Sequence, residues 1–113
     1  MAIPSGSGTE VLKNGVFAAV STSAIKLIDG VADHIYTVIS ITICNTAAAN
    51  ETFDLYLNTP DVVQILSDQA LAANKTFVFN DRLVLTGTHE LVIATASAAD
   101  VDCVVSYIDQ DWS

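Results

Sequence analysis

The sequence predicts an all-β protein: an antiparallel β-sandwich, jelly-roll or immunoglobulin-like, with about seven to nine strands and little helix. Apolar and polar residues alternate with a period of two along most of the chain. The alternating segments are rich in β-branched and aromatic side chains, which suit a pleated and packed surface. Turn residues separate these segments at intervals of roughly 8–12 positions, a spacing typical of sandwiches and barrels.

The first two strands are expected over residues 9–13 and 15–21, with Asn14-Gly15 between them. Asn-Gly is the strongest short hairpin signal in a sequence, so a turn is predicted at this point. A third strand is expected over residues 24–28 and ends at the turn Asp29-Gly30.

The next strand, residues 35–43, is apolar at four of its five odd-numbered positions. Another is expected at residues 53–57, where apolar odd positions alternate with mostly polar even ones. Residues 61–66 could start a helical turn after Pro60 or could equally be a strand, because their β-branched content is high. Residues 58–75 as a whole are expected to form a long connection with at most one turn of helix, because so short a run of helix formers is not stable alone.

Four more strands complete the series. The turns between them are indicated by Asn80-Asp81 and by Thr86-Gly87-Thr88. These strands are expected over residues 76–79, 82–85, 89–95 and 101–108.

A chain of 113 residues predicts one domain. We expect it to cover residues 9–109, between an extended N-terminal arm at 1–8 and a C-terminal tail at 110–113. Ile3 and Pro4 in the arm and Trp112 in the tail are the candidate partner-interface residues. Tryptophan in particular is enriched at interface hot spots.

The apolar content exceeds what one small sandwich needs. Apolar residues make up 51% of the chain and charged residues only 15%. Val38, Val84 and Val92 lie on strand faces opposite the better core positions. Because a domain of this size buries only about 65% of its unfolded surface, the excess predicts a homo-oligomer or docking on a larger assembly.

The charge balance argues against several classes of protein. With 13 acidic and 4 basic residues the net charge is −9, so we expect no nucleic-acid partner, since phosphate binding needs Lys and Arg in numbers. No apolar run approaches the length of a spanning helix, so we expect no membrane partner either. The start of the chain has no secretory signal pattern, which predicts a soluble protein made in the cytosol.

No catalytic, cofactor-binding or metal-binding motif is recognisable. His34 and His89 have no ligand at metal-site spacing on the same element, and we expect structural or surface roles for both. Cys44 and Cys103 are too few for a disulfide scaffold and are expected to be small buried residues. The sequence therefore predicts a protein that is not an enzyme and carries no cofactor.

Several segments resemble small virion structural proteins of tailed phages, particularly marine and cyanobacterial phages. These are AIPSGSGTEVLK at residues 2–13, the stretch from Ile28-Asp29-Gly30 to Ser40, the pattern over residues 74–94, and the ending Ser106-Tyr107-Ile108. The resemblance covers most of the chain and implies a non-enzymatic β-sandwich in the virion, made in the host cytoplasm.

Within that group, the function expected first is a capsid decoration (cement) protein that binds the major capsid protein. Analogy favours a trimer, with the arm and the tail lying on neighbouring subunits. The alternative is a neck, tail or fibre-attachment protein of the virion. An alternative of another class is a carbohydrate-binding module for host recognition, which the 7% aromatic content supports weakly.

Overall fold

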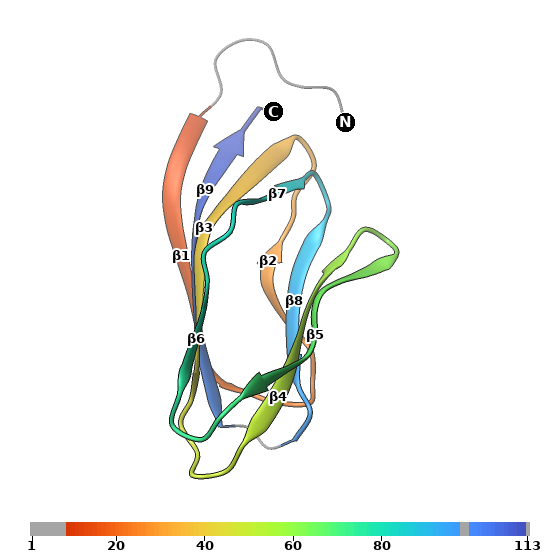
Figure 1. Ribbon diagram of the computed structural model, residues 1–113. Helices are drawn as coiled ribbons and strands as arrows, with labels where there is room; N and C mark the ends of the chain where they lie inside the picture. The colour runs from red at the N-terminus through yellow and green to blue at the C-terminus, as the bar shows by residue number, and fades with distance from the viewer. Residues whose placement is uncertain (1–8, 98–99, 113) are drawn as a thin grey trace.

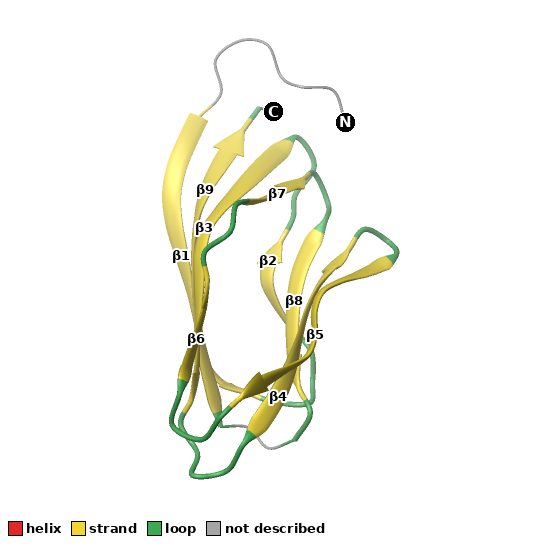
Figure 2. Cartoon of the chain, viewed as in Figure 1, coloured by secondary structure: helices red, strands yellow, loops and turns green. Residues whose placement is uncertain are grey.

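Two antiparallel sheets packed face to face make up the computed structural model, which describes residues 9–97 and 100–112 (Figures 1 and 2). Its described residues form nine strands and no helix. This confirms the predicted β-sandwich and the upper end of the predicted number of strands.

The first sheet, called sheet A, has the strand order β1-β9-β3-β6, and β7 pairs with the other half of β3. Its strands are β1 (Thr9–Val20), β9 (Val101–Asp111), β3 (His34–Asn45), β6 (Thr76–Phe79) and β7 (Leu83–Thr86). The second sheet, sheet B, has the order β2-β8-β4-β5. Its strands are β2 (Ile25–Asp29), β8 (Glu90–Thr95), β4 (Glu51–Asn58) and β5 (Val62–Leu71).

The strand order identifies which kind of sandwich this is. β6 and β7 both pair with β3, β6 through residues 41–44 and β7 through residues 35–38, so together they act as one interrupted strand. Counted in this way, eight strands form two four-stranded sheets with the connectivity of a jelly roll. Of the two predicted types, the jelly roll is therefore the one observed.

The core lies between the sheets and takes every second residue from most strands. Phe53 is 1% exposed and meets Phe77 edge to face, with 5.7 Å between ring centroids. Other fully enclosed side chains are Ile41, Ile43 and Val105 from sheet A and Leu55, Leu91 and Ile93 from sheet B.

A bulge in β3 changes which of its residues face the core. The register with β9 shifts between Val38 and Ser40, so the inward side chains are Tyr36 and Val38 before the bulge and Ile41 after it. Val38 is completely buried, and its predicted position opposite the core is wrong. Ile39 is exposed instead, because the extra residue reverses the alternation.

The predicted turn at Asn14-Gly15 is also wrong. β1 runs unbroken through it, and Asn14 and Gly15 pair with Ser106 and Val105 of β9. A long partner strand provides backbone hydrogen bonds on both sides of this dipeptide and overrides its turn preference. The glycine has a packing reason: a Cβ at Gly15 would lie 2.8 Å from the ring of Phe17.

Residues 58–75 contain a strand, where the sequence predicts a connection. β5 pairs with β4 along its length, with register shifts near Asp54 and Leu55. Asp68 lies at this irregularity with a positive φ of 48°. Its backbone amide donates a hydrogen bond to Oδ1 of Asp54 at 2.7 Å, which stabilises the irregular pairing locally. Pairing with β4 thus determines the conformation of a segment whose own preference is mixed.

Candidate interaction surface

The face of sheet A that points away from the core carries a continuous set of large aliphatic side chains. Strand registers place them in two rows across the sheet, in the strand order β1, β9, β3 and then β6 or β7. One row is Val16, Val104, Thr42 and Val78, and the other is Leu12, Ile108, Thr37 and Val84. We call this the outer face of sheet A. Its aliphatic members are Leu12, Val16, Ile35, Ile39, Val78, Val84, Val104 and Ile108.

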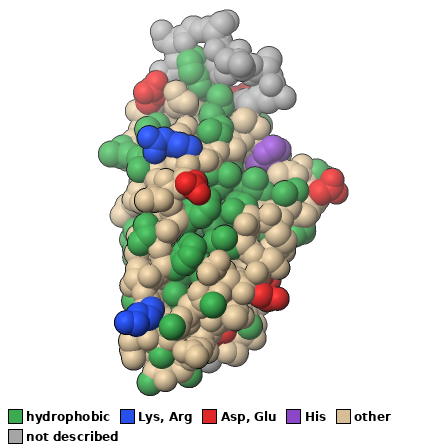
Figure 3. Space-filling view, in the orientation of Figure 1, with side chains coloured by type: hydrophobic (Ala, Val, Ile, Leu, Met, Phe, Trp, Pro, Cys, Tyr) green, Lys and Arg blue, Asp and Glu red, His purple; other side chains and the backbone are tan. Residues whose placement is uncertain are grey.

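Several of these side chains are open to solvent. Leu12 is 72% exposed, Val16 is 70% exposed, and Val78 and Val84 are each 53% exposed. Figure 3 shows hydrophobic side chains on the margin of the sheet next to β6. Scattered exposed apolar residues are ordinary, but a contiguous set across four neighbouring strands is typical of an interaction surface.

Charge is nearly absent from this face. Among the outward positions of the described strands of sheet A, only Glu10 and Asp102 are charged, and they lie at opposite ends of the sheet. Glu10 Oε1 accepts a hydrogen bond from Gln110 at 3.1 Å. The amide of Ala19 donates to Asp102 Oδ1, also at 3.1 Å.

The outer face of sheet B is different. It carries Lys26 and Glu90, whose Nζ and Oε2 atoms are 2.7 Å apart, together with Asp29 and Asp54. The hydrogen bond from Lys26 is the main reason that the pKa of Glu90 lies below its ordinary value. Val92, expected to add exposed apolar surface, is only 4% exposed there. The apolar excess is therefore concentrated on sheet A.

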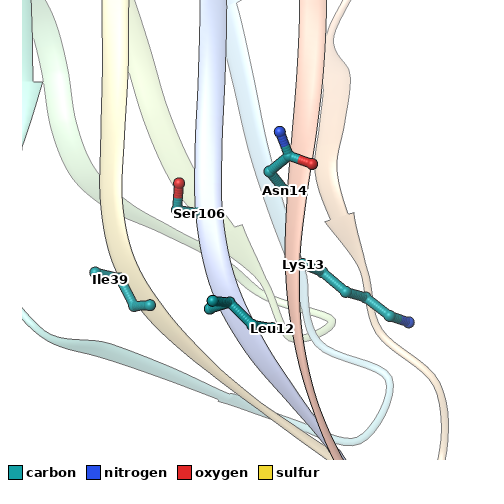
Figure 4. A pocket seen from close by; sticks show the side chains of 5 residues that line it. All are labelled: Leu12, Lys13, Asn14, Ile39 and Ser106. Carbon is teal, nitrogen blue, oxygen red and sulfur yellow. The ribbon is translucent and has the colours of Figure 1, made fainter.

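A hollow of about 390 Å³ interrupts the outer face of sheet A. It is lined by Leu12, Lys13, Asn14, Ile39 and Ser106, which come from β1, β3 and β9 (Figure 4). Lys13 turns its amine away from the hollow in this view, which leaves a mostly uncharged lining. Ile39, which lies at the bulge in β3, is one of the lining residues.

A charged cluster joins three strands at one end of the sandwich. The carboxylate of Asp109, 8% exposed, lies 2.8 Å from Nζ of Lys13 and 2.7 Å from Nδ1 of His34. The ring of His34 also stacks on Tyr36, with 5.8 Å between centroids. Burial would raise the pKa of Asp109, but the hydrogen bonds from Lys13 and His34 outweigh it and hold that pKa below its ordinary value.

This cluster is a crosslink between strands and has no arrangement suited to a metal. Across residues 9–97 and 100–112 no group of three or more His, Cys, Asp or Glu side chains is placed to hold a metal ion. His89, the other histidine, accepts a backbone hydrogen bond from Gly30 at 3.1 Å through its carbonyl. Within the same ranges, no helix has the length and apolar character needed to span a bilayer.

The predicted interface residues divide into two groups. Ile3 and Pro4 lie outside the described residues. Trp112 is half-buried, and its backbone amide donates to the carbonyl of Asp33 at 2.9 Å. Its indole Nε1 is buried and has no hydrogen-bond partner among the described residues. β9 runs to Asp111, two residues into the tail predicted for 110–113.

The two cysteines are free and face opposite ways. Cys103 points into the core, where burial raises its pKa to about 12. Cys44 pairs in register with Asp102 and is half-buried on the outer face of sheet A. The prediction of two buried residues therefore holds for Cys103 only.

Part of this surface was not recognised in the sequence. Its strongest members, Leu12 and Val16, alternate with Glu10 and Asn14, a pattern that a single long strand would produce. The predicted turn at Asn14-Gly15 divided that alternation in two. Reading residues 10–16 as one strand would have placed both side chains on one face.

Comparison with known proteins shows a shared fold at low sequence identity. No protein-family model matches the sequence, and no curated protein matches it. A chain of the Bacillus endospore appendages, a family of disulfide-linked pili, is 16% identical with a TM-score of 0.59, covering 100% of this chain and 97% of that chain. A chain in the structure of infectious bursal disease virus, Gx strain, is 10% identical with a TM-score of 0.50, covering 94% of this chain and 37% of that chain.

Proposed function

We propose that this chain is a non-enzymatic structural subunit of a multi-copy protein assembly. The outer face of sheet A carries this proposal, because it presents eight large aliphatic side chains, six of them exposed and two half-buried, around a nearly uncharged centre. Leaving apolar surface in water costs about 25 cal/mol per Å² relative to burying it. A face of this kind is stabilised when another protein surface covers it.

The structural comparisons support an assembled role in general. The similar chain from the endospore appendages comes from pili and matches this chain over nearly its whole length. The second similar chain comes from a virus and contains the same sandwich within a longer protein. Both neighbours come from large assemblies, a pilus and a virus.

Within this class we propose a virion protein of a tailed phage, and specifically a capsid decoration protein that binds the major capsid protein. The resemblance of residues 2–13 and 28–40 to small phage virion proteins supports this choice. In this proposal the arm with Ile3 and Pro4 and the end with Trp112 contact neighbouring subunits. A neck, tail or fibre-attachment position in the virion is the variant of the same idea.

A fibre subunit is the second candidate. The observation that favours it is that the similarity to the pilus chain extends over 100% of this chain and 97% of that chain. This candidate uses the same outer face but builds an open filament. Electron microscopy distinguishes the two, because a decoration protein alone forms small closed oligomers.

The deciding experiment is copy number together with particle binding. Quantitative mass spectrometry of purified virions that contain the chain should find hundreds of copies for a decoration protein and a dozen or fewer for a neck or fibre position. The purified chain should also co-sediment with capsids stripped of it. A monomer that neither binds capsids nor polymerises at high concentration would overturn the structural role, and filaments of the chain alone would overturn decoration.

A further inference from the structure

We propose that two copies of this chain pair through the outer face of sheet A, related by a two-fold axis parallel to β3. This inference deepens the proposed structural role and names the first partner as a second copy. It follows from the distribution of charge and of aliphatic side chains over the described strands.

Electrostatics limits how two copies can approach each other. Each chain has a net charge of −9, so most approaches bring acidic surfaces together. The outer face of sheet B, with Asp29, Asp54 and Glu90, is such a surface. On sheet A the outward positions between Glu10 and Asp102 are uncharged, so repulsion is weakest there.

The available cations lie on one margin of sheet A. Lys13 and Lys26 are held in ion pairs with Asp109 and Glu90. Lys75 and Arg82 are exposed and form no ion pair with the described residues. They directly precede β6 and β7, on the margin where Figure 3 shows Lys or Arg side chains beside hydrophobic ones.

An acidic residue occupies the matching position on the other side of β3. Asp102 of β9 and Thr76 of β6 both pair with Cys44, so these three residues form one row across the sheet. Lys75 is adjacent to Thr76. Asp102 and Lys75 therefore lie at the same end of the sheet, with β3 midway between them.

A two-fold axis along β3 exchanges the two sides of the sheet. It places Asp102 of one copy opposite Lys75 of the other, and the symmetry produces this contact twice. An axis across the strands would instead carry Asp102 toward the end of the sheet that holds Glu10, bringing like charges together. The charge pattern thus selects one orientation of two.

The aliphatic rows match under the same operation. Val104 and Val78 both flank Thr42, so the axis brings Val104 of one copy over Val78 of the other. Ile108 and Val84 both flank Thr37 and meet in the same way. Two sheets packed face to face, about 10 Å apart with strands within about 30° of parallel, place such rows in contact.

Sedimentation equilibrium of the full chain over a wide concentration range tests the pairing. We expect a monomer–dimer equilibrium whose dissociation constant rises at least tenfold in Val104→Asp and in Val78→Asp. Val62→Asp is the matched control, because Val62 is 60% exposed on β5 of sheet B and should leave the equilibrium unchanged. Circular dichroism of each variant confirms that the fold is intact.

Charge reversal tests the orientation. Lys75→Asp should weaken the dimer several-fold, and Asp102→Lys should do the same. The double variant should recover most of the lost affinity, since the two residues exchange roles across the axis. If each single variant weakens the dimer but the double variant is weaker than both, the two-fold axis along β3 is wrong.

A covalent test does not depend on affinity. Thr42 lies on the proposed axis, so Thr42→Cys in a Cys44→Ser background should be joined between chains by a short bis-maleimide reagent, because sheets about 10 Å apart hold the two thiols too far apart for a direct disulfide. Tyr56→Cys, on the outer face of sheet B, should not crosslink in the same background. Equal crosslinking of both variants would overturn the pairing.

The oligomeric state separates this inference from the proposed function. A trimer would overturn the pairing, because only a two-fold axis brings a face against itself. A monomer that still binds capsids would overturn the pairing and leave the structural role standing. A dimer that joins no particle or fibre would confirm the pairing and remove the structural role.

Discussion

Nδ1 of His34 lies 2.7 Å from Oδ1 of Asp109, and this contact joins the first residue of β3 to a residue near the C-terminal end of β9. Lys13 approaches the second carboxylate oxygen from β1 at 2.8 Å. One carboxylate therefore connects three neighbouring strands at the end of the sandwich where the chain enters β1.

The first prediction concerns Asp109→Asn. The folded-state pKa of Asp109 is below its ordinary value, so its charge stabilises the fold above about pH 4, and this contribution is lost as the pH falls through the folded-state pKa. The variant should lose roughly 1–3 kcal/mol of unfolding free energy at about pH 7 and far less at about pH 2. Urea unfolding at both pH values measures the difference; an equal loss at both would contradict the ionic explanation.

The second prediction concerns Asn45, which is completely buried. Its Nδ2 donates to the carbonyls of Ala49 at 2.8 Å and Leu71 at 3.1 Å, and its Oδ1 accepts from the amide of Ala47 at 3.0 Å. Asn45→Asp would place a carboxylate oxygen against two carbonyls and should cost about 2–4 kcal/mol, more at neutral than at acid pH. Asn45→Ala, which adds no charge, should show no such pH dependence in thermal unfolding.

The third prediction concerns Gly30, which donates its amide to the carbonyl of His89. A Cβ at this position would overlap the carbonyl oxygens of Gly87 and His89, which are backbone atoms that cannot move aside. Gly30→Ala should therefore destabilise the protein by more than about 3 kcal/mol. Gly87→Ala is the comparison: its φ of +61° disfavours alanine, but no atom lies within 4 Å of the new Cβ, so about 1 kcal/mol is expected. Similar losses in the two variants would contradict the steric explanation.

The fourth prediction concerns the thiols. Cys103 is buried and has a pKa of about 12, so its reactive thiolate is almost absent at neutral pH. A thiol reagent should therefore label Cys44 in the native protein and Cys103 only after denaturation. Because the two side chains face opposite sides of sheet A, oxidation should produce no crosslink within one chain. Mass spectrometry of labelled peptides checks both statements, and Cys44→Ser should remove the native labelling.

The fifth prediction concerns Trp112. If its half-buried ring is an anchor for a partner, Trp112→Ala should weaken assembly by more than about 1 kcal/mol while circular dichroism stays unchanged. Trp112→Phe keeps an apolar ring but lacks Nε1, so it separates the contribution of the ring from that of the unpartnered indole nitrogen. Unchanged assembly in Trp112→Ala would show that the residue only covers the end of the sandwich.

Alternation in the sequence predicts most strands because a half-buried strand must present apolar residues to one side only. It fails where pairing with another strand decides the conformation against or beyond local preference. Asn14-Gly15 lies within β1 because β9, at the far end of the sequence, pairs with it and overrides its turn preference. Residues 62–71 form β5 because the preceding strand β4 pairs with them, although their own preference is mixed.

The sequence predicts that an exposed apolar surface exists, but it does not predict which residues form it. Composition shows that apolar residues exceed the need of one core, yet it cannot say which of them remain outside. The bulge at Ile39 buries Val38 and exposes its neighbour. Val92, in register between Lys26 and Tyr56 of sheet B, is only 4% exposed. Of the three residues expected to be outside the core and exposed, Val84 alone is.

The contrast between the two outer faces makes the whole domain an amphiphile on the scale of a sheet. One broad side is hydrated by carboxylates, and the other is wetted poorly. A lone copy should therefore orient itself at any boundary between water and an apolar phase, with the outer face of sheet A turned from the water. We therefore expect the protein to adsorb to air bubbles and to plastic, and we expect mild detergent to suppress this adsorption.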